Sequence, residues 1–102
     1  MFNLVNFSDS NNSSPFSSIR HVDDQGEEYW LARELMALLG YKKWERFVDA
    51  IDRAKIGCQN TGVPVENHFT DAGLYTRNVP SDYRLSRYAC YLVAIACFHT
   101  RQ

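Results

Sequence analysis

The chain lacks the long apolar run that a membrane-spanning helix requires. Its longest uninterrupted apolar stretch has eleven residues, 88–98, whereas a helix that crosses a bilayer needs about 20. The N-terminal sequence MFNLVNFSDSNNSS has neither a basic start nor an apolar core, so it does not have the pattern of a secretory signal. We therefore expect a cytoplasmic protein without a membrane partner.

An excess of charge of either sign is also missing. The 102 residues include 11 Lys and Arg against 12 Asp and Glu, a formal net charge of -1, which excludes a strongly basic histone-like protein and an acidic tail protein. The charges are unevenly placed, because residues 1–32 carry a net charge of -4 and residues 33–102 a net charge of +3. Such asymmetry is compatible with a nucleic-acid face at one end, although this one is modest.

Histidine, glycine and cysteine are too few and too scattered for a catalytic or metal site. His21, His68 and His99 show no ligand spacing, and the five glycines stand singly, so there is no glycine-rich phosphate loop. Cysteines are odd in number, and Cys90 and Cys97 lie about 10.5 Å apart along one expected helix, too far for a disulfide. We expect reduced, buried thiols, no cofactor, no metal and no enzymatic activity.

The N-terminal part predicts a tail followed by a small hairpin. The polar run DSNNSS before Pro15 marks residues 1–15 as a flexible tail, and residues 16–102 then form a single domain. SSIRHV (17–22) predicts a strand, residues 23–26 a turn, and Glu28-Tyr29-Trp30 the start of a second strand. Paired acids flank the turn, but no apolar shielding would raise a carboxyl pKa, so we interpret them as a solvated tip.

Two amphipathic helices follow. The first has apolar residues at Ala32, Leu35, Met36 and Leu39, spaced as on the core face of a helix, and Gly40 should end it. The second repeats this spacing from Trp44 to Ala54, with Gly57 as its expected end. Joined by the turn Tyr41-Lys42-Lys43, the pair has a helix-turn-helix outline.

The C-terminal part predicts short strands and one apolar helix. We expect a loop over residues 58–66, a strand over 72–78 after a lead-in at 68–70, a turn at 80–82, and a returning strand at 83–85. Ser86 is a suitable N-cap for a helix over 88–98. Since that helix is apolar on all sides, it should be buried all round or lie at an interface. The fold class is therefore α+β.

Three separated segments carry a family resemblance. They are YWLAREL (29–35), at the end of the second expected strand and the start of the first helix, LGYKKW (39–44) and YRLSRYACY (83–91). In this order they resemble the N-terminal (Bro-N) domain superfamily of the BRO family of phage antirepressors and viral regulators, in its DNA damage-inducible branch, over roughly residues 16–95. The resemblance implies a compact α+β unit with a helix-turn-helix-like core. It also implies DNA binding, transcription or repressor control and a link to the DNA-damage response, without catalytic residues or cofactor.

The end of the chain departs from that family pattern. Relatives continue after the apolar helix into a polar loop and further helices, whereas here Ala94-Ile95 runs directly into residues 96–102. We expect a C-terminally truncated or internally deleted domain, whose last helix lacks its usual cover.

Basic residues supply the candidate DNA contacts. Lys42, Lys43 and Arg46 stand at the start of the second helix, the part that a helix-turn-helix presents to the major groove. Arg84 and Arg87 flank a helix N-terminus, which favours phosphate. The resemblance implies that six basic residues contact DNA: Arg33, Lys42, Lys43, Arg46, Arg84 and Arg87.

A structural interpretation of the same cations stays open. The spacings Arg46–Asp49, Asp49–Arg53 and Asp52–Lys55 suit ion pairs along a solvated helix face. Arg84 and Arg87 would then pair with acids such as Asp82.

Two functions compete at this point. The first is a non-catalytic DNA-binding regulatory module that docks on DNA. The alternative is a protein-interaction module that modulates a repair or repressor protein, favoured by the near-neutral charge, the apolar last helix and an acidic hairpin tip that suits a basic partner. A degenerate, truncated fragment without activity is a third hypothesis.

Overall fold

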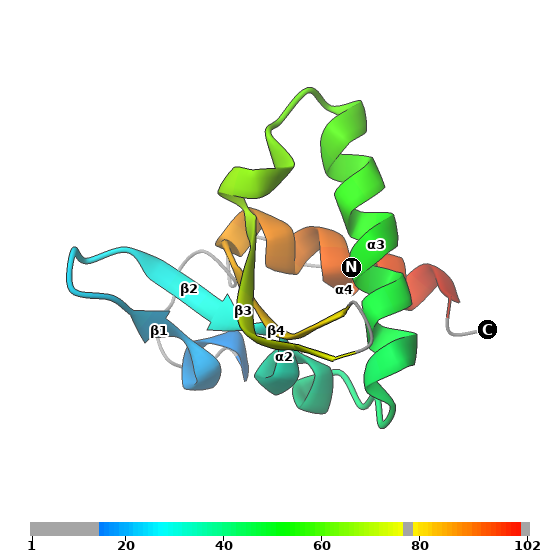
Figure 1. Cartoon of the computed structure of the whole chain (residues 1–102), viewed down its shortest axis with the longest axis horizontal. Coiled ribbons are helices and arrows are strands. Elements are labelled where there is room, and N and C mark those ends of the chain that lie inside the picture. The colour runs from blue at the N-terminus through cyan, green and yellow to red at the C-terminus, as the bar shows by residue number, and fades with distance from the viewer. Residues whose placement is uncertain (1–14, 77–78, 101–102) are drawn as a thin grey trace.

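The structure is a computed structural model that describes residues 15–76 and 79–100, and the predicted tail at residues 1–14 lies outside this range. The α+β class is confirmed (Figure 1). The described elements, in chain order, are η1 (Pro15–Ile19), β1 (His21–Val22), β2 (Glu28–Leu31), α2 (Ala32–Leu38), α3 (Trp44–Asn60), η2 (Val65–Asn67), β3 (Phe69–Thr76), β4 (Val79–Leu85) and α4 (Arg87–Thr100). No helix in these ranges is long and apolar enough to cross a membrane.

One antiparallel sheet organises the fold, with the strand order β1-β2-β4-β3. The central strand β4 pairs with β2 through Trp30↔Leu85 and Leu31↔Arg84, and with β3 from Phe69↔Leu85 to Thr76↔Val79. Figure 1 shows α4 passing behind β3 and β4, α3 standing beside it and α2 below the sheet. Helix α3 packs mainly against α4, although the helix pair α2–α3 has the short turn that the sequence predicts.

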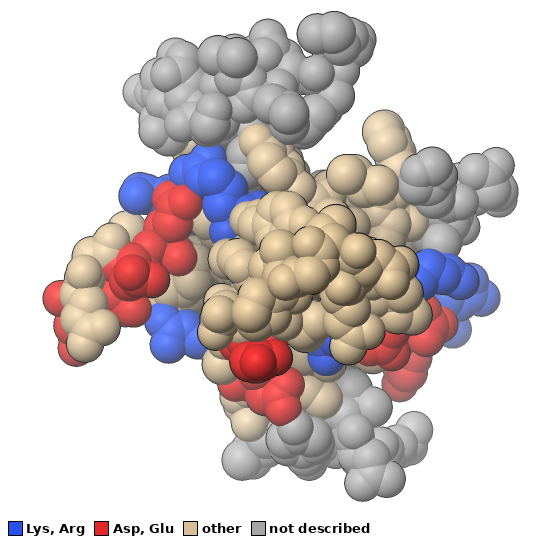
Figure 2. All heavy atoms as spheres, turned by 90° about the horizontal axis from the view of Figure 1, so that it is seen from above, with Lys and Arg blue, Asp and Glu red and all other residues tan. Residues whose placement is uncertain are grey.

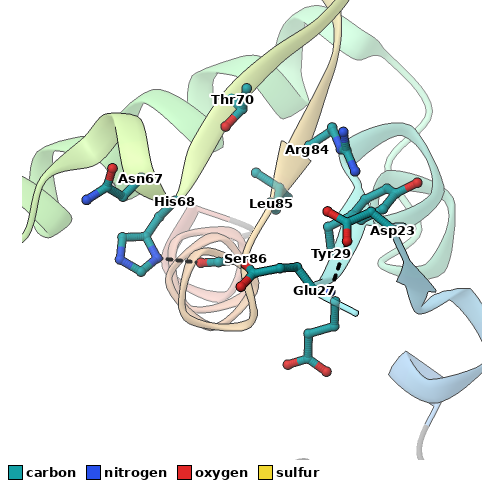
Figure 3. A pocket seen from close by; sticks show the side chains of 10 residues that line it. Asp23, Glu27, Tyr29, Asn67, His68, Thr70, Arg84, Leu85 and Ser86 are labelled. Atoms are coloured by element: carbon teal, nitrogen blue, oxygen red, sulfur yellow. Dashed lines mark hydrogen bonds between the residues drawn. The ribbon is translucent and has the colours of Figure 1, made fainter. Parts of the chain in front are cut away.

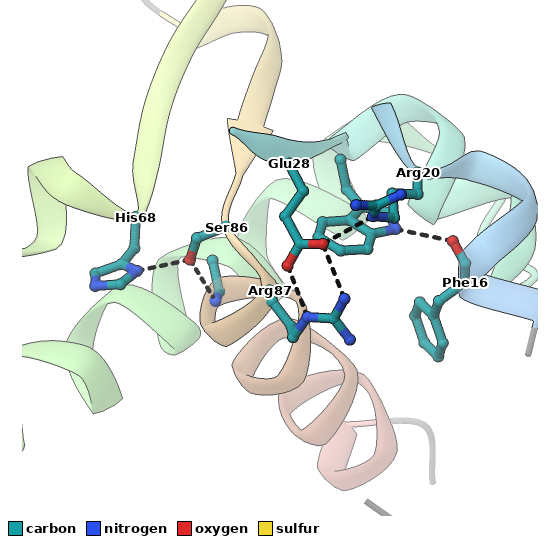
Figure 4. Close-up of polar contacts among 8 residues, drawn as sticks. Phe16, Arg20, Glu28, His68, Ser86 and Arg87 are labelled. Carbon is teal, nitrogen blue, oxygen red and sulfur yellow. Dashed lines mark hydrogen bonds and ion pairs between the residues drawn. The ribbon is translucent and has the colours of Figure 1, made fainter. Parts of the chain in front are cut away.

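Most of the helices and strands contribute one large side chain to the hydrophobic core. The fully buried side chains Trp30, Leu35, Phe47, Leu85 and Val93 come from β2, α2, α3, β4 and α4. The indole Nε1 of Trp30 also donates a hydrogen bond to the carbonyl oxygen of Phe16, 3.0 Å away, which fixes η1 against the core (Figure 4). The apolar stripes of both predicted helices therefore face inward, as expected.

All three cysteines are buried free thiols, as the sequence predicts. Burial raises the pKa of the Cys58 thiol, with the nearby Glu66 adding to the shift, and it raises the pKa of Cys90 strongly. A raised thiol pKa removes the reactive thiolate, so Cys58 and Cys90 serve packing.

Glycine ends both amphipathic helices, but the second end differs from the prediction. Gly40 has φ of 83°, and the N–H groups of Gly40 and Tyr41 donate to the carbonyls of Ala37 and Met36, a Schellman motif. Helix α3, however, does not end at Gly57. It runs to Asn60, and Gly62, with φ of 80°, makes the corresponding turn.

The burial of Cys58 explains the longer helix. Cys58 lies four residues after Ala54, and both are buried in the core, so one more helical turn extends the apolar stripe. The residues from 58 to 60 therefore belong to α3, and the predicted loop over 58–66 is wrong in these three residues and in its last two, which lie in η2.

Two strand predictions also need correction. The expected strand over 17–22 is a 3-10 helix up to Ile19, closed by a hydrogen bond from Ser18 Oγ to the Pro15 carbonyl, and only His21–Val22 is a strand. The predicted turn at 80–82 lies inside β4. Proline is tolerated there because the paired residues of β2 reach only Arg84 and Leu85, so Pro80 lacks a ladder partner on that side.

The cap of α4 is confirmed, whereas its burial differs in part. Ser86 Oγ accepts a hydrogen bond from the Ala89 N–H, 3.0 Å away. The helix buries Ala89, Cys90, Val93 and Cys97 but leaves Ile95 and Phe98 52% and 80% exposed. Burial on all sides is therefore wrong, and the interface alternative stays a prediction.

Candidate nucleic-acid interface

The six predicted contact residues fall into two separate groups. Arg33, Lys42, Lys43 and Arg46 lie at the corner between α2 and α3, which we call the α2–α3 corner. Arg84 and Arg87 lie where β4 passes into α4. The corner contacts β4 at Pro80, Ser81 and Asp82, and Arg84 lies two residues beyond Asp82, about 7 Å at the rise of an extended strand.

Three cations of the α2–α3 corner point into solvent. Lys42, Lys43 and Arg46 are exposed, and none of their side chains forms an ion pair or hydrogen bond with another described residue. The intrahelical pairs expected along α3, such as Arg46–Asp49, do not form among the described residues. The side chains of Lys42, Lys43 and Arg46 are therefore available to a partner.

The first turn of α3 adds to the positive character of the corner. Lys43 is the N-cap residue, and no side chain caps the helix there. The free N–H groups of the first turn carry a partial positive charge. The acids Glu45 and Asp49 offset part of this positive field. The corner is therefore a basic cluster of limited extent.

Arg33 is exposed like its neighbours, but its Nε and its backbone N–H form hydrogen bonds within the fold. Its Nε donates to the Ser81 carbonyl at 2.8 Å, and its guanidinium lies 4.1 Å from the centre of the Trp44 ring. Its backbone N–H donates to Asp82 Oδ1 at 3.0 Å. Trp44 Nε1 in turn donates to the Pro80 carbonyl at 3.2 Å, so α2, α3 and β4 are tied together here.

Arg87 is engaged in an ion pair, although with an acid other than Asp82. Its Nε and Nη2 donate to the two carboxylate oxygens of Glu28 at 2.7 and 2.8 Å, and Arg20 donates to the same carboxylate at 2.8 Å (Figure 4). The hydrogen bond from Arg87 is the main cause that lowers the pKa of Glu28 to about 2, with Arg20 contributing, against the opposing effect of burial. Glu28 was missed as a partner because 59 residues separate it from Arg87.

Arg84 stacks on Tyr29 at the edge of a groove. Its guanidinium lies 3.8 Å from the centre of the Tyr29 ring. Figure 3 shows the residues that line the groove between the β1–β2 hairpin and the start of β3, with His68 and Ser86 on the side away from Tyr29 and Asp23. It encloses about 180 Å³, and His68 Nδ1 and Ser86 Oγ lie 2.6 Å apart in it.

Carboxylates outnumber cations around this groove. Asp23, Glu27 and Glu28 line it together with Arg84, and Asp23 lies beside Arg84 in Figure 3. Hydrogen bonds from the backbone N–H groups of Glu27 and Gln25 lower the pKa of Asp23, which keeps that carboxyl ionised. No group of three or more His, Cys, Asp or Glu in the described ranges could hold a metal ion. Because Glu28 is already paired with Arg87 and Arg20, Asp23 and Glu27 are the carboxylates that would repel a phosphate here.

The face shown in Figure 2 carries no broad field of one sign. Its centre, at the end where α3 passes into the connection to β3, is uncharged, and acidic and basic side chains are mixed around it. The α2–α3 corner lies at the opposite, lower end in Figure 1.

Comparison with known proteins identifies the family of the chain. The family model "BRO family, N-terminal domain" matches residues 18–99, so the chain belongs to the BRO family as an N-terminal domain. It is also similar to the DNA damage-inducible protein D of Escherichia coli (strain K12), with 39% identity over 85 residues, which cover 78% of this chain and 31% of that protein. The chain thus matches about a third of the length of this relative. No solved structure gives a significant match.

Proposed function

We propose that this chain is a non-catalytic regulatory module that binds duplex DNA through the α2–α3 corner. The observation that carries the proposal is the set of exposed, unpaired cations at the start of α3: Lys42, Lys43 and Arg46. Family membership supports a role in phage antirepressor-type transcription control. The name of the Escherichia coli relative supports a link to the DNA-damage response.

Docking would depend on the phosphate backbone. Lysine and arginine that neutralise phosphates release condensed counterions, and this makes the affinity fall as salt rises. The partial positive charge at the start of α3 adds to the attraction. Lys42 and Lys43, just before α3, and Arg46, in its first turn, lie within five residues of chain, and in this proposal they contact neighbouring phosphates.

Arg84 and Arg87 serve the fold in this proposal. The stack of Arg84 on Tyr29 and the ion pair of Arg87 with Glu28 engage both guanidinium groups. The carboxylates beside them disfavour a phosphate. We therefore assign the direct contacts to the corner.

A salt series tests the proposal. Binding of the chain to a fluorescent duplex of random sequence is followed by anisotropy between about 50 and 200 mM salt. The logarithm of the binding constant is plotted against the logarithm of the salt concentration, and each phosphate contact should contribute about -0.9 to the slope. Three contacts predict a slope of about -3, and Lys42→Ala/Lys43→Ala should bring it to about -1. Arg84→Ala is the control and should leave the slope unchanged. A flat salt dependence of the unmodified chain, or an unchanged slope in the double variant, would overturn the proposal.

The protein-interaction function is the second candidate, and the exposed side chains of α4 favour it. Ile95 and Phe98 are 52% and 80% exposed, which is unusual for large apolar residues on one helix face. This function predicts no DNA binding but a complex with a repair or repressor protein that Phe98→Glu weakens, measured by sedimentation of the mixed proteins.

A further inference from the structure

We propose that Arg33 is a positioning residue that fixes the α2–α3 corner against β4, and not a phosphate contact. This inference rests on the proposed DNA-binding function and deepens it. It adds the strand β4 to the docking unit and gives one of the predicted contact residues a different role.

The contacts of Arg33 and Trp44 form a clamp across three elements. The side chain of Arg33, from α2, donates to the carbonyl of Ser81, and the side chain of Trp44, from α3, donates to the carbonyl of Pro80. These two carbonyls belong to consecutive residues of β4. The guanidinium and the indole ring stack at 4.1 Å, so the two donors hold each other in place.

The clamp stands where ordinary helix capping is missing. The residues that cap α2 and α3 at their N-terminal ends, Leu31 and Lys43, make no side-chain capping bond. For α2, Asp82 supplies the acceptor from β4, because its Oδ1 receives the N–H of Arg33 at 3.0 Å. The beginning of α3 depends on Trp44, whose immediate neighbour in the chain is Lys43. Fixing Trp44 therefore fixes the basic turn.

The chemistry of arginine makes the two roles separable. A phosphate contact needs a positive charge, which lysine also provides. The clamp needs a flat guanidinium that stacks on an indole while its Nε donates to a carbonyl, and a lysine ammonium cannot reproduce that geometry. Without the clamp, the turn would have to become ordered on binding, which weakens affinity without changing the number of phosphates neutralised.

The experiment compares matched variants at two arginines in the same salt series. Arg33→Lys and Arg33→Ala should both weaken DNA binding roughly five- to tenfold at every salt concentration, the order expected for losing a stack and a charge-assisted hydrogen bond, with an unchanged slope. At the contact residue, Arg46→Ala should lower the slope by about 0.9 and Arg46→Lys should restore it. Urea unfolding checks that each variant is folded during titration, and Arg33→Lys decides the case if Arg33→Ala unfolds.

Three outcomes would overturn the inference. If Arg33→Lys binds like the unmodified chain while Arg33→Ala has a smaller slope, Arg33 is a direct contact, and the proposed function stands. If both variants bind like the unmodified chain, the clamp has no role in binding. If the unmodified chain itself shows no salt-dependent binding, the proposed function fails and this inference fails with it.

Discussion

The carboxylate of Glu28 receives two hydrogen bonds from the guanidinium of Arg87, at 2.7 and 2.8 Å. This pair joins the first residue of β2 to the first residue of α4. With Arg20 on the same carboxylate, it holds the N-terminal hairpin against the helix that completes the core.

The pair makes stability depend on pH in the acid range. The pKa of Glu28 falls from 4.5 to about 2 on folding, so its contribution is present above pH 4.5 and is lost as the pH falls towards 2. Each unit by which the pKa is lowered corresponds to about 1.4 kcal/mol of stability. Solvent screens part of this effect because the Glu28 side chain is 28% exposed, so the contribution of the pair is on the order of 2 kcal/mol.

Glu28→Gln should therefore lower the free energy of unfolding at pH 7 by about that amount and flatten its decline between pH 5 and about 2. Urea unfolding at several pH values measures both effects. Glu27→Gln is the matched control, because that neighbouring carboxylate is exposed and forms no ion pair among the described residues. Equal pH profiles for Glu28→Gln and the unmodified chain would contradict the assignment.

The cap of α4 gives a second prediction. Ser86 Oγ accepts the N–H of Ala89 and contacts His68 Nδ1, so Ser86→Ala should destabilise the chain by about 1 to 2 kcal/mol. Ser86→Asp keeps an acceptor for the N–H and should recover much of the loss. Thermal unfolding followed by far-UV circular dichroism measures the difference. A neutral Ser86→Ala would show that the cap adds nothing.

A third prediction uses two glycines to locate the end of α3. Gly57 lies inside the helix, and an added Cβ would meet no atom within 4 Å, so Gly57→Ala should stabilise the chain by about 0.5 to 1 kcal/mol. Gly62 has φ of 80°, and Gly62→Ala should destabilise it by about 1 kcal/mol. Urea unfolding of both variants provides the measurement. The reverse order of stabilities would place the helix end at Gly57.

Local signals were sufficient for much of the fold. The spacing of Leu35 and Leu39, the glycine at 40 and the serine at 86 each act within a few residues of chain, and the structure confirms the elements that they predict. The end of α3 was misplaced because a glycine permits a helix end without requiring one. The deciding factor was the buried position of Cys58, which depends on packing between distant segments.

The site was harder to predict for the same reason. Sequence spacing could identify Lys42, Lys43 and Arg46 as a cluster, because they are neighbours in the chain. It could not show that Arg33 bonds to Ser81, 48 residues away. Periodicity assigned Trp44 to the core, whereas its half-buried ring also supports a guanidinium.

The binding of DNA at the α2–α3 corner is the central claim, and amide chemical shifts test it most directly. A ¹⁵N-labelled chain is titrated with a short DNA duplex at low salt, and the shift of each backbone amide is recorded. We expect the largest changes at residues 42–47, with smaller changes at 81–82, where β4 meets the corner. Changes confined to residues 23–29 and 84–87, or no changes at all, would contradict the account.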